Sequence, residues 1–281
     1  MTPPADDVGN RAGRSGLPVG DLLAGDADTV DLPVPASALA VGAHPDDIEF
    51  GCGATLAKWA AAGCRLHHLI LTDGSKGSWD PHAQPAALVA ERMGEAWAAA
   101  AVIDGAPDRD SRRDDRLIFL QRVDGALENG IAERREVARI IRTIRPAVLV
   151  GHDPWRRYRL HPDHRAAGFL TLDALVAARD PHFFVDLDLP PHRPEALLLF
   201  EADQPNHLED ARGFEQTKID ALLCHTSQWE STMDIDGPAT AAGPSDSERA
   251  SFAAKVHRQL ADHGSVAGRQ RGEAFHLMTD L

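Results

Sequence analysis

The chain has 281 residues, enough for one large domain whose core needs no disulfide support. Its 29 Lys and Arg against 43 Asp and Glu give a formal net charge of −14, which argues against nucleic acid or an anionic membrane surface as the main partner. Three cysteines without a CxxC pair predict reduced thiols. The longest apolar run, near residues 96–103, is too short to cross a bilayer, so we expect no integral membrane anchoring.

Residues 1–36 are rich in Pro, Gly and Asp and predict an extended or partly disordered arm, followed by a single domain over 37–281. The arm lacks the basic start and apolar centre of a secretory signal, so we expect a cytoplasmic protein. Within the domain, strands are predicted at 38–43, 66–72, 117–120, 147–151 and 196–200, and helices at 52–62, 86–101, 132–145, 165–178, 213–224 and 247–262, with a loop at 234–247. This alternation predicts an α/β, Rossmann-like fold: a mostly parallel sheet with helices on both faces.

Two clusters of histidine and aspartate follow predicted strands. The sequence HPDD at 44–47 comes directly after strand 38–43, and HPDH at 161–164 lies in the loop after strand 147–151, which also carries His152 and Asp153. The carboxyl ends of parallel strands meet at one edge of the sheet, where open α/β folds place their ligands. We therefore expect the two clusters to share one site.

Imidazole and carboxylate groups suit zinc, and three protein ligands with one open position are typical of a catalytic metal. The natural trio is His44, Asp47 and His164. Pro45 stiffens the turn and should point Asp46 and Asp47 in different directions, so that one acid binds metal while the other faces a bound water. The alternative is that HPDD merely caps the following helix, but the second cluster makes this the weaker interpretation.

The chain resembles the PIG-L or LmbE-like zinc deacetylases, which include N-acetylglucosaminyl-phosphatidylinositol de-N-acetylase and the mycothiol and bacillithiol pathway deacetylases. The resemblance extends from about residue 38 to the sequence AFHL near 274. It depends mainly on three motifs, AHPDD at 43–47, GCGATL at 51–56 and HPDH at 161–164. Weaker similarities are TDGSKG at 72–77, RMGE at 92–95, VDG at 123–125 and KIDALLCHTSQ at 218–228.

The resemblance implies a role for each residue of the two main motifs. His44, Asp47 and His164 would bind zinc, Asp46 would be the general base, and His161 would stabilise the oxyanion as a cation or donate a proton. Asp163 would orient or tune His161. This division suits amide hydrolysis, because a zinc-bound water has a pKa near 7 and the leaving amine needs a proton.

Other residues have weaker support. Arg92 and Asp124 align with family positions that line a sugar pocket, although either could be simply solvated. His225 resembles a family histidine near the pocket but could equally interact with helix-terminal carbonyls. Tyr158 stands three residues before His161, where some relatives have a tyrosine two residues before it, so a role for it is doubtful. The loop 155–159 carries a tryptophan and three arginines and predicts either a basic rim or a solvated segment.

The predicted function is removal of an acetyl or other acyl group from an N-acyl amino sugar or its conjugate. A same-family amidase that acts on a larger thiol conjugate or a glycosylated metabolite is the nearest alternative. A noncatalytic metal-containing sugar-binding module is the alternative from another class, and the intact Asp46 and His161 count against it. Fe²⁺ or Co²⁺ could replace Zn²⁺ in such a site. Because some relatives self-associate, a homo-oligomer is an open expectation.

Overall fold

The structure is a computed structural model of the chain and describes residues 29–105, 116–236 and 245–281. The strands are β1 (Thr29–Val30), β2 (Ser37–Gly42), β3 (Arg65–Thr72), β4 (Leu117–Arg122), β5 (Val148–His152), β6 (Ala196–Phe200), β7 (His207–Asp210) and β8 (Gly272–Met278). The α-helices are α1 (Asp47–Ala61), α2 (Pro85–Ile103), α3 (Ile131–Ile144), α4 (Pro162–Arg179), α5 (Glu215–Leu223) and α6 (Asp246–Ser265). Three short helical turns, η1 (Val185–Leu187), η2 (Thr226–Gln228) and η3 (Trp229–Met233), complete the described elements.

The strands form one sheet in the order β1-β7-β8-β6-β5-β2-β3-β4. The five strands from β6 to β4 are parallel to their neighbours, whereas β8 is antiparallel to both β6 and β7. From β2 the chain proceeds outward to β3 and β4, and from β5 it proceeds in the other direction to β6. The topological switch point therefore lies between β2 and β5, and ligands bind beyond the carboxyl ends of the strands at such a point.

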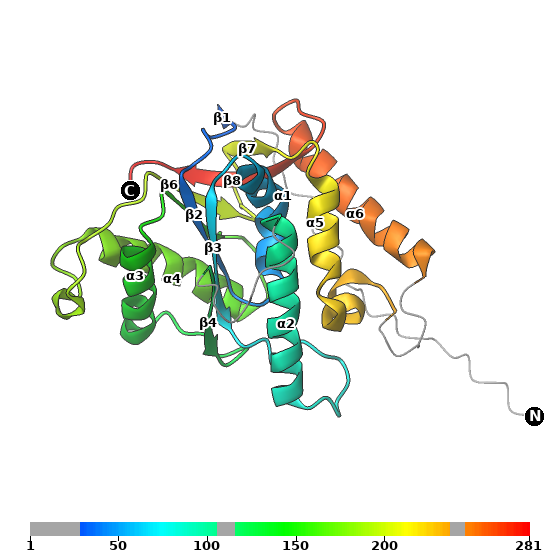
Figure 1. Cartoon of the computed structure of the whole chain (residues 1–281), viewed down its shortest axis with the longest axis horizontal. Coiled ribbons are helices and arrows are strands. Elements are labelled where there is room, and N and C mark those ends of the chain that lie inside the picture. Colours follow the sequence, from blue (N-terminus) through cyan, green and yellow to red (C-terminus); the bar gives the residue numbers. More distant parts are fainter. Residues whose placement is uncertain (1–28, 106–115, 237–244) are drawn as a thin grey trace, which may run out of the picture.

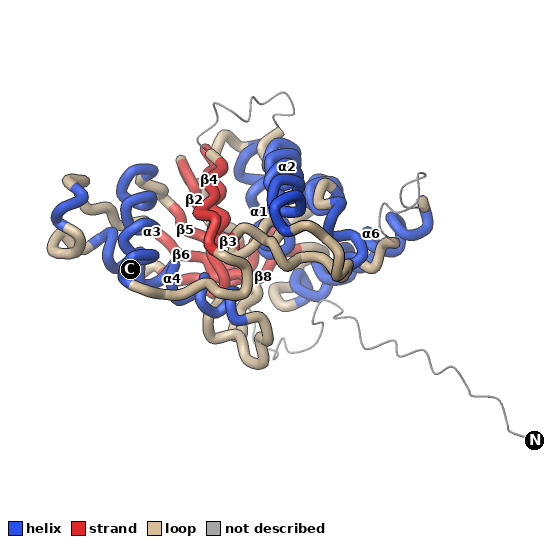
Figure 2. Tube along the Cα trace, turned by 90° about the horizontal axis from the view of Figure 1, so that it is seen from below, coloured by secondary structure: helices blue, strands red, loops and turns tan. Residues whose placement is uncertain are grey.

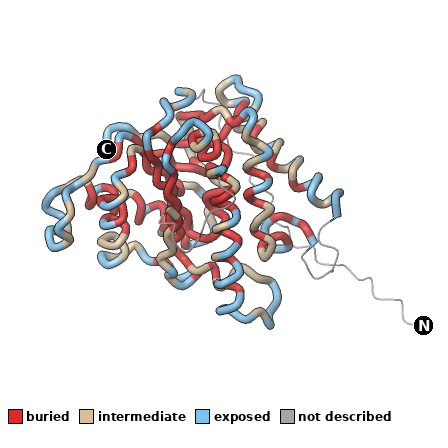
Figure 3. The backbone as a smooth tube through the Cα atoms, viewed as in Figure 1, coloured by how far each residue is buried: buried red, intermediate tan, exposed pale blue. Residues whose placement is uncertain are grey.

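Helices cover both faces of this sheet (Figures 1 and 2). Helices α3 and α4 pack on one face, and α1, α2, α5 and α6 lie on the other. Every residue of β2, β5 and β6 is buried, which explains why these strands are almost continuously apolar. The buried positions accordingly concentrate on the central strands (Figure 3).

The predicted α/β class, the five parallel strands and all six helices are confirmed. Helix α1 begins five residues earlier than predicted, at Asp47 rather than 52, because the acids and glycines of 47–53 hid its first turn. Strands β1, β7 and β8 were not predicted. The predicted N-terminal arm lies outside the described residues up to position 28, and its end contributes Thr29–Val30 to the sheet.

Helix α1 is broken near its middle, where Cys52 has φ −149° and ψ 19°. A buried ion pair satisfies the backbone groups that this break releases. The Lys218 ammonium donates to the Phe50 carbonyl at 2.7 Å and to Glu273 at 2.6 Å, and Glu273 accepts the N–H groups of Ala54 and Thr55 at 3.1 and 2.7 Å. Elements α5 and β8 thereby fix the shape of the helix that follows the HPDD turn.

The described residues contain no helix with both the length and the apolar character needed to cross a bilayer. The three cysteines are free thiols, as predicted; Cys52 and Cys64 are buried and Cys224 is half-buried.

Candidate functional site

The two predicted clusters meet at the switch point of the sheet. The turn 43–46 connects β2 to α1, and the loop 153–161 connects β5 to α4. Asp46 has a left-handed backbone, with φ 114°, which is a strained conformation for a residue other than glycine and is typical of functional sites. Asp46 stands at the N-cap of α1, but its side chain makes no capping hydrogen bond, so the capping interpretation does not account for the motif.

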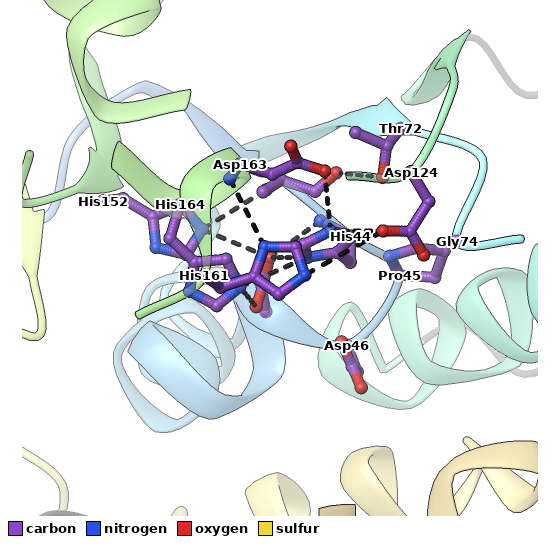
Figure 4. A network of polar contacts seen from close by, with 12 residues as sticks. His44, Pro45, Asp46, Thr72, Gly74, Asp124, His152, His161, Asp163 and His164 are labelled. Atoms are coloured by element: carbon purple, nitrogen blue, oxygen red, sulfur yellow. Dashed lines mark hydrogen bonds and ion pairs between the residues drawn. The ribbon is translucent and has the colours of Figure 1, made fainter. Parts of the chain in front are cut away.

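Three of the predicted side chains converge closely. The His44 Nδ1 atom lies 3.2 Å from His164 Nε2 and 3.3 Å from Asp47 Oδ2, and His164 Nε2 lies 3.4 Å from Asp47 Oδ1. A tetrahedral ion with bonds of about 2.0–2.1 Å holds its ligands about 3.3 Å apart. Each pair among His44, Asp47 and His164 has this spacing, with His44 facing one Asp47 oxygen and His164 the other. Within the described residues, the donor sets that could hold one ion are His44, His161 and His164; His44, Asp124, His161 and Asp163; and Asp47, His152 and His164. The cluster as a whole (Figure 4) is therefore compatible with a divalent metal, and the choice of His44, Asp47 and His164 as the ligands stays a prediction.

The charge states of two of these side chains fit metal binding as well. Burial penalises the charged form of Asp47, but the charge and hydrogen bond of His152, with a hydrogen bond from His44, hold the pKa of its carboxyl well below the usual range, so the carboxylate is ionised. Burial, with the nearby His152 and Arg159, lowers the pKa of His164 to about 3, so this imidazole is neutral. Metal binding requires an ionised carboxylate and neutral imidazoles. His44 differs, because hydrogen bonds with Asp124, Asp163 and Asp47 outweigh its burial and raise its pKa well above the ordinary value, so it must release a proton when an ion binds.

Two further residues, His152 and Glu201, lie behind the trio, and the sequence did not predict a role for either. The His152 Nε2 atom lies 3.2 Å from Asp47 Oδ2, and its Nδ1 lies 3.5 Å from Glu201. Arg159 donates to Glu201 at 2.8 Å and to His164 Nδ1 at 2.9 Å. His152 was noticed in its loop without a role. Glu201 follows β6 directly, so the rule that ligands gather at strand ends could have identified it.

Asp46 and Asp47 point in different directions, as predicted. Asp47 faces the histidines, whereas the Asp46 carboxylate lies 3.5 Å from the guanidinium of Arg92. No dashed line joins Asp46 to the cluster in Figure 4. Burial raises the pKa of Asp46 to about 6, an effect that Arg92 partly offsets. A carboxyl group with a pKa near neutrality is suited to accept a proton at physiological pH.

Arg92 lies behind Asp46 rather than at an open surface, with 3% of its surface exposed. Its guanidinium donates to the backbone carbonyls of Pro45 at 2.6 Å and Gly74 at 3.0 Å. Gly77 leaves room for it, since a Cβ atom there would lie 2.2 Å from Arg92 Nη1. Arg92 therefore braces the turn that carries Asp46, and its predicted contact with a substrate remains a prediction.

His161 lies at the edge of the cluster with its side chain 43% exposed. Its Nδ1 accepts the backbone N–H of Asp163 at 3.3 Å, which favours a neutral ring with its proton on Nε2. That atom lies 4.0 Å from Asp124. Partial burial and the neighbouring His44 lower the pKa of His161, which favours a neutral hydrogen-bond donor, and its predicted role as a cation stays a prediction.

Asp163 and Asp124 both contact His44, and the predicted contact of Asp124 with a substrate stays a prediction. The His44 Nε2 atom lies 3.2 Å from Asp163 Oδ2 and 3.2 Å from Asp124 Oδ1. Asp163 was expected to orient His161, yet the hydrogen bond between those two residues is formed by the Asp163 backbone. Asp124 also accepts the Lys76 backbone N–H at 3.0 Å.

His225 is fully buried and lies 3.4 Å from the buried Glu49, so it pairs with α1 rather than with helix-terminal carbonyls.

Tyr158 in the loop before α4 is 89% exposed and makes no contact with the donor cluster among the described residues. The arginines of loop 155–159 bind the segment after β6: Arg156 donates to the Ala202 carbonyl at 3.1 Å and Arg157 to Asp203 at 2.9 Å. These contacts anchor the loop.

The fold and the site together define a doubly wound α/β protein with a His and Asp cluster compatible with a metal at its switch point. The sequence model of one family, PIG-L: GlcNAc-PI de-N-acetylase, matches residues 39–175. The diacetylchitobiose deacetylase of Thermococcus kodakarensis is 32% identical over 201 residues, which are 68% of this chain and 69% of that relative. The chain belongs to the PIG-L family.

Two further comparisons agree with this membership. The 1D-myo-inositol 2-acetamido-2-deoxy-alpha-D-glucopyranoside deacetylase of Kineococcus radiotolerans is 34% identical over 169 residues, which are 52% of this chain and 46% of that relative. Among solved structures, the N,N'-diacetylchitobiose deacetylase from Pyrococcus horikoshii, complexed with its inhibitor MPG, superposes with a TM-score of 0.74 at 24% identity, covering 87% of this chain and 84% of the other. At this identity the structural match shows the shared fold.

Proposed function

We propose that the protein is a metal-dependent N-deacetylase that acts on an N-acyl amino sugar or a conjugate of one. The observation that carries the proposal is the convergence of His44, Asp47 and His164, whose nitrogens lie 3.2 Å apart and each 3.3–3.4 Å from one of the two Asp47 oxygens, beside the separate, buried Asp46 carboxylate. Family membership supports it, because the named relatives are deacetylases of compounds that contain N-acetylated glucosamine. A cytoplasmic location and self-association stay predictions.

In this proposal His44 Nδ1, His164 Nε2 and an Asp47 oxygen hold the metal, which requires the His164 proton to move to Nδ1 in place of the hydrogen bond from Arg159; Zn²⁺ is the ion that the donor set favours. When bound, the ion polarises the acyl oxygen and lowers the pKa of a water molecule. Asp46 takes the proton of the attacking water, because its carboxylate is buried, near neutrality in pKa and oriented by Arg92. The His161 Nε2–H group stabilises the developing oxyanion as a hydrogen-bond donor, and Asp46 gives the proton that it took from the water to the departing nitrogen, so that both carboxylate and imidazole end in their starting states.

The test is amine release from diacetylchitobiose and from N-acetylglucosaminides by the full chain. Protein stripped with a chelator should release no amine, and one equivalent of Zn²⁺ should restore turnover, because without the ion the water has a pKa far above neutrality. Mass spectrometry of each product identifies the acyl group that is lost. Zinc-loaded, folded protein that deacylates none of these amides would refute the proposal.

The contacts around Arg92 lead to a second expectation. Replacing Gly77 with alanine should lower kcat/KM by up to about 10²-fold, since the new Cβ displaces the guanidinium that braces the Asp46 turn. Gly94→Ala is the matched control: it lies on α2 with open space around its Cβ position and should keep full activity. Steady-state kinetics on diacetylchitobiose compares them, and equal activity of the two variants would show that Arg92 needs no fixed position.

A further inference from the structure

The Asp163 carboxylate is completely enclosed at the start of α4. Its Oδ2 accepts the Gly125 backbone N–H at 2.6 Å and its Oδ1 accepts that of Leu127 at 3.2 Å. These two bonds attach the loop after β4 to α4 and fix both oxygens. The carboxylate is thereby held in a fixed position. Its Oδ2 also lies 3.2 Å from Nε2 of His44.

The two ring nitrogens of His44 face different surroundings (Figure 4). Its Nε2 lies 3.2 Å from Asp163 Oδ2 and 3.2 Å from Asp124 Oδ1, so carboxylates meet this atom from two sides. Its Nδ1 faces the other two donors, His164 and Asp47, at 3.2 and 3.3 Å. A neutral imidazole has one proton, and two carboxylates favour it strongly on Nε2. The lone pair is then on Nδ1 and points at the other donors.

We propose that Asp163, with Asp124, is a positioning residue that holds His44 as the Nε2–H tautomer and so makes Nδ1 the metal-binding atom. This inference rests on the proposed metal site and stands beside the predicted electrostatic action of Asp163 on His161, which stays a prediction. A carboxylate that accepts the second N–H of a ligating histidine fixes the ring and raises its basicity, and its loss typically costs 10–100-fold in metal affinity.

Asp163→Asn should therefore weaken Zn²⁺ binding by about 10- to 100-fold, measured by competition with a chromogenic chelator at constant pH. The control is Asp173→Asn, on the same helix, which loses contacts with Asn129 at 2.8 Å and Arg134 at 3.1 Å without touching His44. It should bind Zn²⁺ as the unmodified chain does. An Asp163→Asn variant with unchanged Zn²⁺ affinity but reduced kcat would overturn the inference and would instead support the predicted action of Asp163 on His161.

A second measurement uses the unmodified protein and so does not depend on whether the Asp163→Asn variant folds stably. The long-range ¹H–¹⁵N spectrum of the histidine side chains in the unmodified, zinc-loaded protein, assigned with His44→Gln, should show His44 protonated at Nε2. Protonation at Nδ1 would overturn the inference. Both readouts are independent of turnover: if the protein binds Zn²⁺ in an Asp163-dependent way but deacylates nothing, the proposed function fails while this inference stands.

Discussion

Replacing Asp46 with asparagine is expected to lower kcat by about 10²- to 10⁴-fold while the protein keeps its metal. The amide has nearly the same shape and can still meet Arg92, but it cannot take a proton from water. Metal content should not change, because the Asp46 carboxylate is directed at Arg92 and not at the His44, Asp47 and His164 donors. Steady-state kinetics on diacetylchitobiose, together with zinc analysis of the same samples, provides both readouts.

The same substitution at the neighbouring Asp47 should have a different effect. Asp47→Asn removes a charged donor from the cluster and should lose both metal and activity, so two adjacent and similar substitutions separate the roles. An Asp46→Asn enzyme within a few-fold of normal kcat would contradict the assignment of the general base, and loss of zinc from it would place Asp46 among the ligands.

The pH profile offers an independent check on the same residue. A base must be ionised to act, and the pKa of Asp46 in the metal-free protein is about 6. A bound cation nearby lowers this pKa, so about 6 is its upper bound in the metal-loaded enzyme. The Asp46 contribution to kcat/KM should thus be complete at about pH 7 and above and disappear as the pH falls through a value of about 6 or lower. The residual activity of Asp46→Asn should lack this acidic limb.

The core of the site could be predicted from the sequence because it depends on strand ends. HPDD follows a strand directly, so its place at the sheet edge is fixed within one or two residues, and HPDH begins a helix after the neighbouring strand. The trio therefore converges as expected. The partners of each ring could not be predicted, because the pairing of Asp163 with His44 and of Glu201 with His152 depends on side-chain directions from four separate places: the turn after β2, the end of β5, the start of α4 and the residue after β6.

The missed parts of the fold have a common cause. Strands β7 and β8 carry charged residues at fully buried positions, Glu209 and Glu273, which hide the apolar pattern of a strand. Glu273 can be buried because it pairs with Lys218 and accepts backbone N–H groups at the break in α1. These partners lie on elements that are distant in sequence. No local pattern shows such a pairing.

That pairing makes Lys218 the position where we expect the largest loss of stability. Lys218→Met should reduce the free energy of unfolding by about 3–5 kcal/mol, since removal of one partner leaves a buried Glu273 charge without a cation. The Phe50 carbonyl at the break in α1 also loses its donor. Urea unfolding followed by circular dichroism measures the change.

Lys255→Met is the matched control, because Lys255 also pairs with an aspartate, Asp234, but both side chains are about one-third exposed. Water screens such a pair, and its loss should cost about 1 kcal/mol or less. If the two variants unfold at the same urea concentration, the buried pair is not what holds the broken helix. If only Lys218→Met is destabilised and its zinc affinity also falls, the ion pair of Lys218 with Glu273 also stabilises the turn that carries Asp46 and Asp47.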